Sequence, residues 1–455
     1  MPDNAKLDWK TVAEETTKLL SELLQLDTTN PPGNEKIAAD YLQGLLSQEG
    51  IESQILESAP GRSNLIARLK GRQPGKRLML LSHTDVVPVN DPDQWKYPPF
   101  SGVVAEGYVW GRGALDMKSM TATETMVMLL FKRLKLDFAG ELILAAVADE
   151  EQGSSYGGNW LVQNHPDLMR SDYVLNEGGG MPLQIGEQVF YTVDTTEKGL
   201  WWVRLRFKGA AGHASVPHQD NAIAKSARLI DRLAGHQFPK QIAPAVQEFF
   251  VRVGQALGPQ GVRAAQVITS DNQQVDLKSL LAGTPLDANL VYAFTHTTCS
   301  PTMIRAGVKE NVIPARCEFV LDFRFVPGYS REQIEETIEQ LAGELAAELE
   351  IETIQHHPAS ESPISDPFYQ IIEETVRQEI PGAQAVPYLL TGATDSRFMR
   401  QLGAAAYGFS PLSTQMSLSE RTKLVHSANE RIDIGSLKLG VKLLYTIARR
   451  ALQVV

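Results

Sequence analysis

The chain has 455 residues, of which 43% are hydrophobic and 21% are charged. This length exceeds what one ordinary core accommodates, so we expect two domains or one large domain with an insertion. The formal net charge of -11 argues against a nucleic-acid partner, which needs a basic face. The polar amino terminus lacks an apolar signal core, and nowhere do about 18 apolar residues run together, so we expect a cytoplasmic protein with no membrane partner.

Helix and strand patterns alternate along the first part of the chain. The helix patterns occupy residues 9–26, 35–49 and 117–135, and the strand patterns occupy 53–58, 64–71, 141–151 and 172–180. Apolar strands separated by helices predict a mostly parallel sheet with helices on both faces. We therefore predict an α/β domain built from residues 1–198 and 356–455.

The pattern changes at "EKGLWWVRLRFKG", residues 197–209. Apolar side chains there alternate with polar ones, which is typical of a sheet that is solvated on one face. Helix patterns follow at residues 221–235 and 330–349, and strand patterns at 291–307 and 315–328. We predict that residues 199–355 form an inserted α+β domain.

Ionisable residues collect where the apolar runs of the first domain end, or in the loops that follow them. The set consists of His83, Asp85, Asp116, Glu150, Glu151, Glu177 and, late in the chain, His426. In open parallel sheets ligands bind beyond the carboxyl ends of the strands, so we treat this set as one candidate site. Imidazoles and carboxylates without thiolates match the ligand chemistry of Zn, Mn or Co.

The spacing within the set suggests a division of roles. In an extended His83-x-Asp85 both side chains point the same way, so Asp85 can hold the far ring nitrogen of His83. The adjacent Glu150 and Glu151 point to opposite sides if the chain is extended, so one can bind metal while the other moves a proton. Taken singly, any of these residues is more often an ordinary loop residue.

Five motifs in this order, "HTDVVPV", "GRGALDMKSM", "ADEEQGS", "NEGGG" and "LVHSANE", together resemble the M20 family of metallopeptidases and aminoacylases. The resemblance covers nearly the whole chain, and "QWKYPPFSG" looks closest to the carboxypeptidase S and N-acyl-amino-acid hydrolase branch. It implies a catalytic metal-binding domain, an inserted lid and dimerisation domain, and two divalent metal ions. Zn²⁺ is the first choice for these ions, with Co²⁺ or Mn²⁺ as alternatives.

The resemblance also implies roles for single residues of the first domain. The implied ligands are Asp116, which bridges both ions, His83 and Glu177 on one ion, and Glu151 and His426 on the other. Glu150 is the implied general base, and Asp85 supports the ligand His83. The resemblance further implies a cis peptide bond between Asp116 and Met117.

Four residues receive implied roles outside the metal set. The motif "GAAGHASVPH" resembles the segment whose histidine reaches the active site of a partner subunit, which makes His213 catalytic and the protein a homodimer. "KENVIPA" and "DFRFVPG" offer Asn311 and Arg324 for substrate binding, and "TGATDSRF" resembles a substrate loop around Gly392. Without the resemblance, a turn histidine and a surface arginine are the simpler interpretations of His213 and Arg324.

These observations predict a metal-dependent hydrolase that cleaves an amide or peptide bond next to a free carboxylate. An N-acyl-amino-acid hydrolase or a carboxypeptidase fits this description, and a dipeptidase is the nearest alternative. A catalytically silent binding protein is the alternative from a different class. Such chains usually lose metal ligands, whereas every implied ligand is present here.

Overall fold

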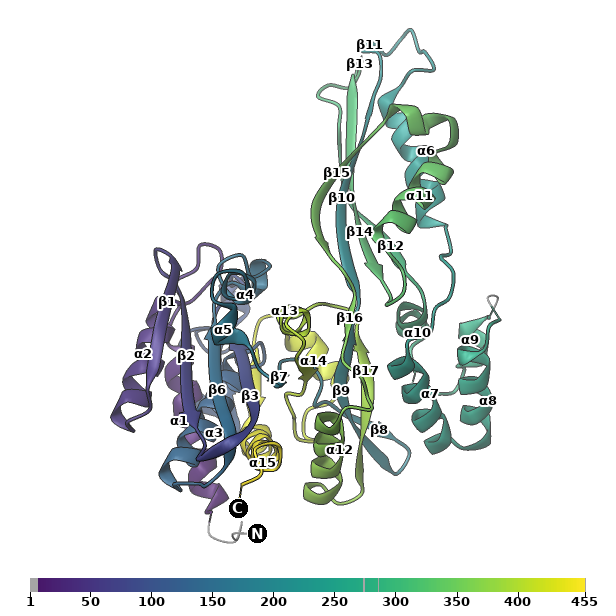
Figure 1. Ribbon diagram of the computed structural model, residues 1–455. Coiled ribbons are helices and arrows are strands. Elements are labelled where there is room, and N and C mark those ends of the chain that lie inside the picture. The colour runs from purple at the N-terminus through teal and green to yellow at the C-terminus, as the bar shows by residue number, and fades with distance from the viewer. Residues whose placement is uncertain (1–6, 273–274, 285, 455) are drawn as a thin grey trace. The chain divides into compact units, whose positions relative to one another are not determined.

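The computed structural model describes residues 7–272, 275–284 and 286–454 (Figure 1). The chain forms two compact units. Unit 1 runs to Thr195 and also includes Ser362–Tyr388 and the chain from Thr394 onward, whereas unit 2 comprises Thr196–Glu361 and Leu389–Ala393.

The larger sheet has ten strands, in the order β1-β2-β6-β3-β7-β18-β9-β16, with β8 and β17 also paired to β9. The strands are β1 Ser53–Ala59, β2 Arg62–Lys70, β3 Gln73–His83, β6 Ala139–Val147, β7 Tyr173–Asn176, β8 Pro182–Ile185, β9 Gln188–Glu197, β16 Ser360–Glu361, β17 Ala383–Leu390 and β18 Ala405–Gly408. The four central strands β6, β3, β7 and β18 run parallel, and β1, β2 and β9 join antiparallel. The predicted α/β class is confirmed, with the parallel part at the centre of the sheet.

Helices cover both faces of this sheet. The helices of unit 1 are α1 Trp9–Leu24, α2 Lys36–Gln48, α3 Lys118–Arg133, α4 Gly158–Asn164, α5 Pro166–Met169, α12 Pro367–Glu379, α13 Ser396–Gln401, α14 Leu418–Leu424 and α15 Ile434–Ala451. Along β3, Leu78 and Leu80 pack in the core with α1, α3 and α15, while Met79 packs on the other side with Leu161 of α4 and Met399 of α13. The alternation of a strand thus places apolar side chains in two cores, as a sheet between two helix layers requires.

A small three-stranded sheet joins two distant parts of unit 1. Its strands are β4 Val104–Ala105, β5 Tyr108–Trp110 and β19 Arg431–Asp433, in the order β19-β5-β4. Trp110 pairs with Arg431, so the segment after β5 and the segment before β19 lie side by side. These two segments carry Asp116 and His426.

Unit 2 contains a four-stranded antiparallel sheet in the order β12-β14-β10-β15. Its strands are β10 Gly199–Lys208, β12 Thr298–Ala306, β14 Arg316–Phe325 and β15 Leu349–His357. The side chains of Trp201, Val203, Leu205 and Phe207 are buried, and the helices α6 Ala222–Ala234 and α11 Arg331–Ala342 pack on this face (Figure 1). The predicted alternation along β10 is confirmed.

Four helices of unit 2 have no counterpart in the predicted elements. They are α7 Pro244–Ala256, α8 Gly258–Thr269, α9 Leu277–Leu280 and α10 Ala288–Thr295. The strand predicted from residue 291 is therefore wrong in its first part, and β12 begins only at Thr298. Val291 and Phe294 are buried at helical spacing, and the Asp287 side chain caps α10 by accepting a hydrogen bond from the backbone N–H of Leu290 at 2.9 Å.

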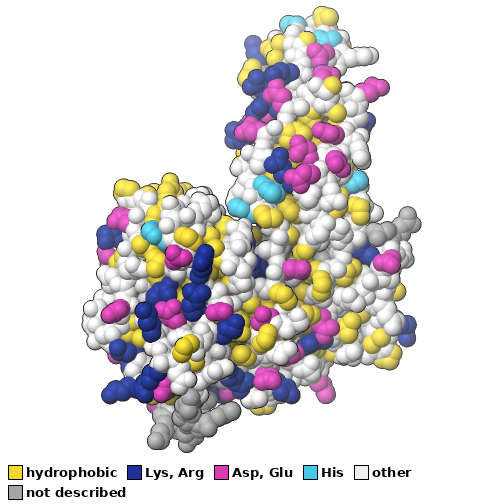
Figure 2. All heavy atoms as spheres, in the orientation of Figure 1, with side chains coloured by type: hydrophobic (Ala, Val, Ile, Leu, Met, Phe, Trp, Pro, Cys, Tyr) yellow, Lys and Arg dark blue, Asp and Glu magenta, His cyan; other side chains and the backbone are white. Residues whose placement is uncertain are grey.

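The surface of unit 1 in Figure 2 mixes Lys and Arg side chains with Asp and Glu side chains. Within the described ranges, no helix is both long enough and apolar enough to cross a bilayer.

Candidate metal centre

His83 is the last residue of β3 and only 1% of it is exposed. Its Nδ1 atom lies 3.0 Å from the backbone oxygen of Asp85 and 3.3 Å from the Asp85 Oδ1 atom. Its Nε2 atom lies 3.1 Å from Asp116 Oδ1 and 3.9 Å from Glu177 Oε2. Asp85 therefore fixes the ring, and the opposite nitrogen faces two carboxylates.

Asp116 stands between two imidazoles. Its Oδ1 atom faces His83, whereas its Oδ2 atom lies 3.2 Å from Nε2 of His426. The same His426 nitrogen lies 3.3 Å from Oε1 of Glu151. The peptide bond between Asp116 and Met117 is cis, which confirms the prediction for this bond.

The strand pattern predicted to run to Glu151 ends earlier, at Val147, so Glu150 and Glu151 are not extended. After β6 the chain enters a short 3-10 turn, Glu150–Gln152, which Asp149 precedes with a φ of 66°. Asp85 accepts the backbone N–H of Glu150 on Oδ1 at 3.1 Å and that of Glu151 on Oδ2 at 3.2 Å. Asp85 thus anchors the turn as well as His83, a contact that the spacing alone did not indicate.

A buried network of ion pairs and hydrogen bonds, which the sequence analysis missed, also holds this turn in place. Arg62 pairs with Glu35 at 2.6 Å and with Asp149 at 2.7 Å. The side-chain amide of Asn30 donates to Asp85 Oδ2 at 2.8 Å and to Asp149 Oδ1 at 2.9 Å. Buried charges are tolerated when they are paired in this way.

A second missed residue is Asp395, which is 2% exposed and lies three residues after Gly392 within the motif "TGATDSRF". Its Oδ1 atom accepts a hydrogen bond from the Ser154 hydroxyl, and its Oδ2 atom is buried without a hydrogen bond. A Cβ atom at Gly158 would lie 2.7 Å from this carboxyl, so only glycine fits there. Burial raises the pKa of Asp395 to about 6.

The electrostatics of the cluster match a cation site. Burial, with Glu177 beside it, raises the pKa of Glu150 well above its usual value, and burial raises that of Glu177 to about 8. Burial alone would lower the pKa of His83, but hydrogen bonds with Asp116 and Asp85 outweigh it and hold this pKa well above the usual value. Hydrogen bonds with Asp116 and Glu151 raise the pKa of His426 to about 10. Without a cation, each carboxyl group of the cluster is stabilised by its own proton or by a protonated imidazole nearby. A bound cation would take the place of these protons.

The donor atoms also fit metal ions by their arrangement. Two sets of three offer ligand atoms within 4.8 Å of one another: His83, Asp116 and Glu151, and His83, Glu150 and Glu177. Oε1 of Glu151 is buried, with Nε2 of His426 at 3.3 Å. All seven residues predicted around the metal lie in unit 1, and the structure brings them together.

The other four predicted residues lie in unit 2. His213 is exposed on the two-residue strand β11 Gly212–His213, which pairs with β13 Val312–Ile313, and its Nδ1 atom lies 2.7 Å from the Ser215 hydroxyl. The backbone N–H of Ala214 donates to the carbonyl of Asn311 at 3.0 Å, so Asn311 lies beside His213. In Figure 2, histidine side chains are visible at the end of unit 2 that carries β11 and β13.

Arg324 and Gly392 occupy separate positions of unit 2. Arg324 on β14 donates from Nε to Asp322 Oδ1 at 2.8 Å and from Nη2 to Asp322 Oδ2 at 3.3 Å. One edge of its guanidinium, formed by Nε and Nη2, is therefore bound to Asp322. Gly392 belongs to the segment Leu389–Ala393.

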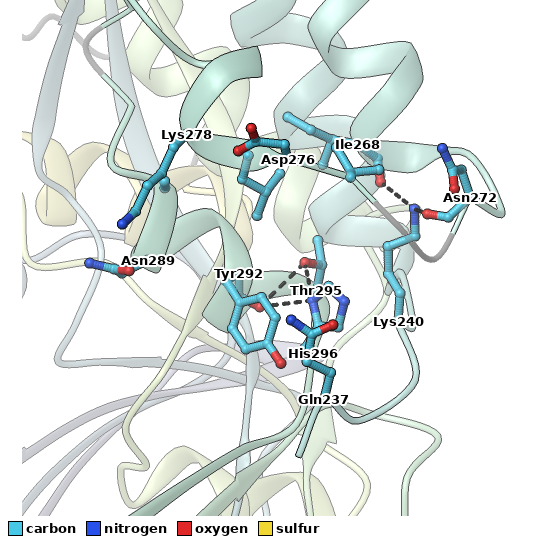
Figure 3. A pocket seen from close by; sticks show the side chains of 13 residues that line it. Gln237, Lys240, Ile268, Asn272, Asp276, Lys278, Asn289, Tyr292, Thr295 and His296 are labelled. Atoms are coloured by element: carbon cyan, nitrogen blue, oxygen red, sulfur yellow. Dashed lines mark hydrogen bonds between the residues drawn. The ribbon is translucent and has the colours of Figure 1, made fainter. Parts of the chain in front are cut away.

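A cavity of about 560 Å³ lies wholly within unit 2, and residues of α8, α9 and α10 line it together with Gln237 and Lys240 from the segment before α7 (Figure 3). Tyr292 and His296 stack in it with ring centroids 4.2 Å apart. The ammonium of Lys240 donates to the carbonyl oxygens of Ile268 at 3.2 Å and Asn272 at 2.6 Å. Burial lowers the pKa of His296 to about 4, so this imidazole is neutral at pH 7.

A parallel-centred α/β domain with imidazoles and carboxylates at its strand ends, together with an inserted α+β unit, defines a class of metal-dependent hydrolases. Residues 79–450 match the peptidase family M20/M25/M40, and the chain belongs to this family. It is a hydrolase related to aminoacylases.

Two relatives and two solved structures illustrate the kinship. The chain is 27% identical to aminoacylase-1B of Rattus norvegicus, over 93% of this chain and 92% of that protein. It is 26% identical to the human N-fatty-acyl-amino acid synthase/hydrolase PM20D1, over 84% and 76%. The fold is shared with the M20 family metallo-carboxypeptidase Sso-CP2 from Sulfolobus solfataricus, at a TM-score of 0.71, 20% identity and coverage of 97% and 100%. It is also shared with YXEP of Bacillus subtilis, described as a dinuclear metal binding peptidase, at a TM-score of 0.62, 15% identity and coverage of 98% and 100%.

Proposed function

We propose that the protein hydrolyses an amide bond next to a free α-carboxylate, as an N-acyl-amino-acid hydrolase does, with two divalent metal ions. One observation carries the proposal: the two oxygens of Asp116 face two different imidazoles, at 3.1 Å from His83 and 3.2 Å from His426. A carboxylate in that position is suited to bridge two cations.

The remaining ligands follow from the same distances. Glu177 lies on the His83 side of Asp116 and Glu151 on the His426 side, which supports one ion held by His83 and Glu177 and another held by Glu151 and His426. Asp85 positions His83 and the backbone of the Glu150–Gln152 turn. Zn²⁺ is the ion that we propose first, since the donors are nitrogen and oxygen atoms of histidine and carboxylate side chains.

Glu150 is the proton carrier of the proposed reaction. Bound divalent cations supply Lewis acidity and lower the pKa of water toward neutrality. Glu150 takes the proton of the attacking water and returns it to the leaving nitrogen. Burial, with Glu177 beside it, raises the pKa of Glu150 above its usual value, which favours its holding the proton before the return step.

We propose that unit 2 serves as the lid and dimerisation domain and recognises the substrate. The Nη1 side of Arg324 and the Asn311 side chain bind the free carboxylate end, and the backbone at Gly392 approaches the substrate closely. A Cβ at Gly392 would meet only Leu390 Cγ, at 3.9 Å, so the segment leaves room beside its backbone. His213 donates a hydrogen bond to the developing oxyanion in the other subunit of a homodimer, which its exposed position supports.

The names of the relatives support the substrate class. Aminoacylase-1B and the N-fatty-acyl-amino acid synthase/hydrolase both act, by their names, on acylated amino acids. The description of YXEP as a dinuclear metal binding peptidase supports the proposal of two ions. At 15% identity, the likeness between YXEP and this chain shows a shared fold.

The test is a hydrolysis screen with metal-loaded protein. The panel contains N-acyl amino acids, the same compounds as C-terminal amides, and dipeptides. We expect turnover of N-acyl amino acids, loss of turnover after chelation, and recovery with Zn²⁺, Co²⁺ or Mn²⁺. Faster turnover of dipeptides would assign the dipeptidase alternative, and no turnover of any compound by fully loaded protein would favour the silent binding protein.

A further inference from the structure

Three segments of unit 1 that are far apart in sequence are bonded together beside His426. The segments are residues 94–96, 111–116 and 426–430, and we call this arrangement the clamp. The Asn429 side chain donates to the Gln94 carbonyl at 2.9 Å and accepts the Lys96 backbone N–H at 2.6 Å. The backbone N–H of Gly111 donates to the Glu430 carbonyl at 3.0 Å. Two sequence motifs without an assigned chemical role, "QWKYPPFSG" and the "NE" of "LVHSANE", supply much of the clamp.

A buried ion pair lies at the base of the clamp. Arg112 Nη1 lies 2.6 Å from Glu430 Oε2, and both side chains are at most 1% exposed. Glu430 Oε1 accepts the backbone N–H of Leu115 at 2.8 Å and that of Asp116 at 3.1 Å. The second guanidinium nitrogen of Arg112, Nη2, donates to the His426 carbonyl at 3.2 Å. One ion pair therefore reaches the backbone of both Asp116 and His426.

His426 needs such support more than His83 does. The His83 side chain is 1% exposed and packed from all sides, whereas the His426 side chain is 49% exposed. The backbone φ of His426 is 62° and that of Asn429 is 64°. Residues other than glycine adopt this left-handed backbone conformation only at a cost in free energy. Burial therefore restrains His426 less than His83, and its position depends on the clamp bond to its carbonyl as well as on the contacts of Nε2 with Asp116 and Glu151.

The pairing also explains why arginine occupies position 112. A planar guanidinium reaches Glu430 and the His426 carbonyl with separate nitrogens, which the single ammonium of lysine does not. Trp95 covers this group, with its ring centroid 5.4 Å from Arg112 Cζ. Because the pair is buried, loss of one partner would leave the other charge buried without a compensating charge and out of reach of water.

We propose that Arg112 and Glu430 are positioning residues that set the affinity of the metal site formed by Asp116, Glu151 and His426. The inference rests on the proposed function for the identity of these ligands. It adds that this site depends on a bond network outside the ligands, whereas the His83 and Glu177 side depends on burial and on Asp85.

The test measures metal binding rather than turnover. Metal-free wild type and Arg112→Lys are titrated with Co²⁺, whose visible absorption reports ligand geometry, and affinities are obtained by competition with a chelator. We expect two Co²⁺ per wild-type chain. In Arg112→Lys we expect the ion on the His83 side to bind as tightly as in the wild type. The ion on the His426 side is expected to bind about 10- to 100-fold more weakly, which is the usual effect of removing a residue that supports a metal ligand.

The matched control is Glu141→Gln, which breaks the pair of Glu141 with Arg68 at 2.7 Å near the start of β6, away from the carboxyl ends of the strands. It is expected to bind both ions as wild type does. Wild-type affinities for both ions in folded Arg112→Lys, or equal weakening of both, would overturn the inference. If Arg112→Lys does not fold by circular dichroism, Asn429→Gly decides, because glycine keeps the left-handed backbone and removes only the bonds to residues 94–96. Unchanged binding in that variant overturns the clamp.

The same titration separates the two proposals. If the wild type binds only one Co²⁺ per chain, the binuclear centre of the proposed function fails. The clamp then stands if Arg112→Lys weakens this single ion by the same factor, and falls if it does not.

Discussion

The candidate residues of unit 1 are buried among one another, whereas those of unit 2 lie near its surface. His83 and Asp85 are at most 1% exposed and contact each other, while His213 is exposed and bonds only to its neighbour Ser215 among the side chains around it. Burying several ionisable groups together is unfavourable unless each is compensated. The cluster in unit 1 therefore fits a cation by its own geometry, whereas the proposed roles of the unit 2 residues require substrate or a second subunit.

The largest effect on turnover is expected from substitution of Glu150, the proposed proton carrier in the buried cluster. Glu150→Gln keeps the shape of the side chain but cannot accept a proton, so we expect kcat to fall by about 100- to 10,000-fold. Metal content, measured by elemental analysis, is expected to stay at the wild-type value. The control is Glu52→Gln, an exposed carboxylate of the same unit. Near-normal turnover of Glu150→Gln would assign the base to another residue.

The second prediction tests whether the exposed His213 contributes to turnover at the buried metal site. His213→Ala is expected to lower kcat by about 100-fold, the usual effect of losing one oxyanion donor. His218→Ala, which alters another exposed histidine of the same loop, is expected to leave turnover unchanged.

Mixing subunits sharpens this comparison between the units. Equal amounts of Glu150→Ala and His213→Ala protein are exchanged, so that half of the dimers are mixed. If His213 acts across the dimer, each mixed dimer has one intact site, and activity returns to about a quarter of wild type. A mixture as inactive as its parts shows that His213 does not act in the partner subunit.

Arg324 provides a smaller effect in unit 2. Arg324→Lys removes the guanidinium while keeping the charge near Asp322, and we expect kcat/KM for an N-acyl amino acid to fall about tenfold. The corresponding amide substrate, which lacks the carboxylate, is expected to lose much less. Arg316→Lys, at the exposed start of the same strand, is the control. Equal loss on both substrates would make Arg324 a structural residue.

The smallest effect concerns the one buried histidine of the unit 2 cavity in Figure 3. His296 has a pKa of about 4 in the folded chain against an ordinary value of 6.5, so the unfolded chain binds the proton first on acidification. The stability from neutral His296 is complete above pH 6.5 and is lost as the pH falls toward 4, by about 2 kcal/mol at pH 4.5.

His296→Phe is the matched variant, because phenylalanine keeps a ring against Tyr292 and does not titrate. Denaturant unfolding at pH 7 and pH 4.5 is expected to show a smaller loss of stability in this variant than in the wild type. The same loss in both proteins would contradict the assignment to His296.

The sequence indicated the features of this molecule that depend on local pattern or on residue chemistry. The α/β class, the alternation along β10, the family and the cis bond after Asp116 are confirmed. The roles of the metal and substrate residues stay predictions. Helix α10 was missed because a short apolar run such as the one around Val291 fits a strand or a buried helix.

Supporting contacts were missed for a different reason. Arg112 and Glu430 are separated by 318 positions, and Asn30 and Asp149 by 119. No periodicity reports such a pair, because each residue satisfies its partner through the fold rather than through its neighbours in the chain. The order of the motifs predicts which residues are the ligands, whereas the contacts that hold these residues in place are visible only in the structure.

The division of the chain between the two units limits how unit 2 can be studied in isolation. The polypeptide passes between the units four times, since Leu389–Ala393 belongs to unit 2 although the residues on both sides of it belong to unit 1. An expressed fragment of residues 196–361 lacks this segment and loses the 3.1 Å bond from the backbone N–H of Lys198 to the Leu390 carbonyl. Lys198 is 1% exposed, so this bond lies in a buried part of unit 2. Limited proteolysis that cuts once on either side of residues 196–361 would likewise release an incomplete unit, and a soluble version of unit 2 needs Leu389–Ala393 grafted back through a linker.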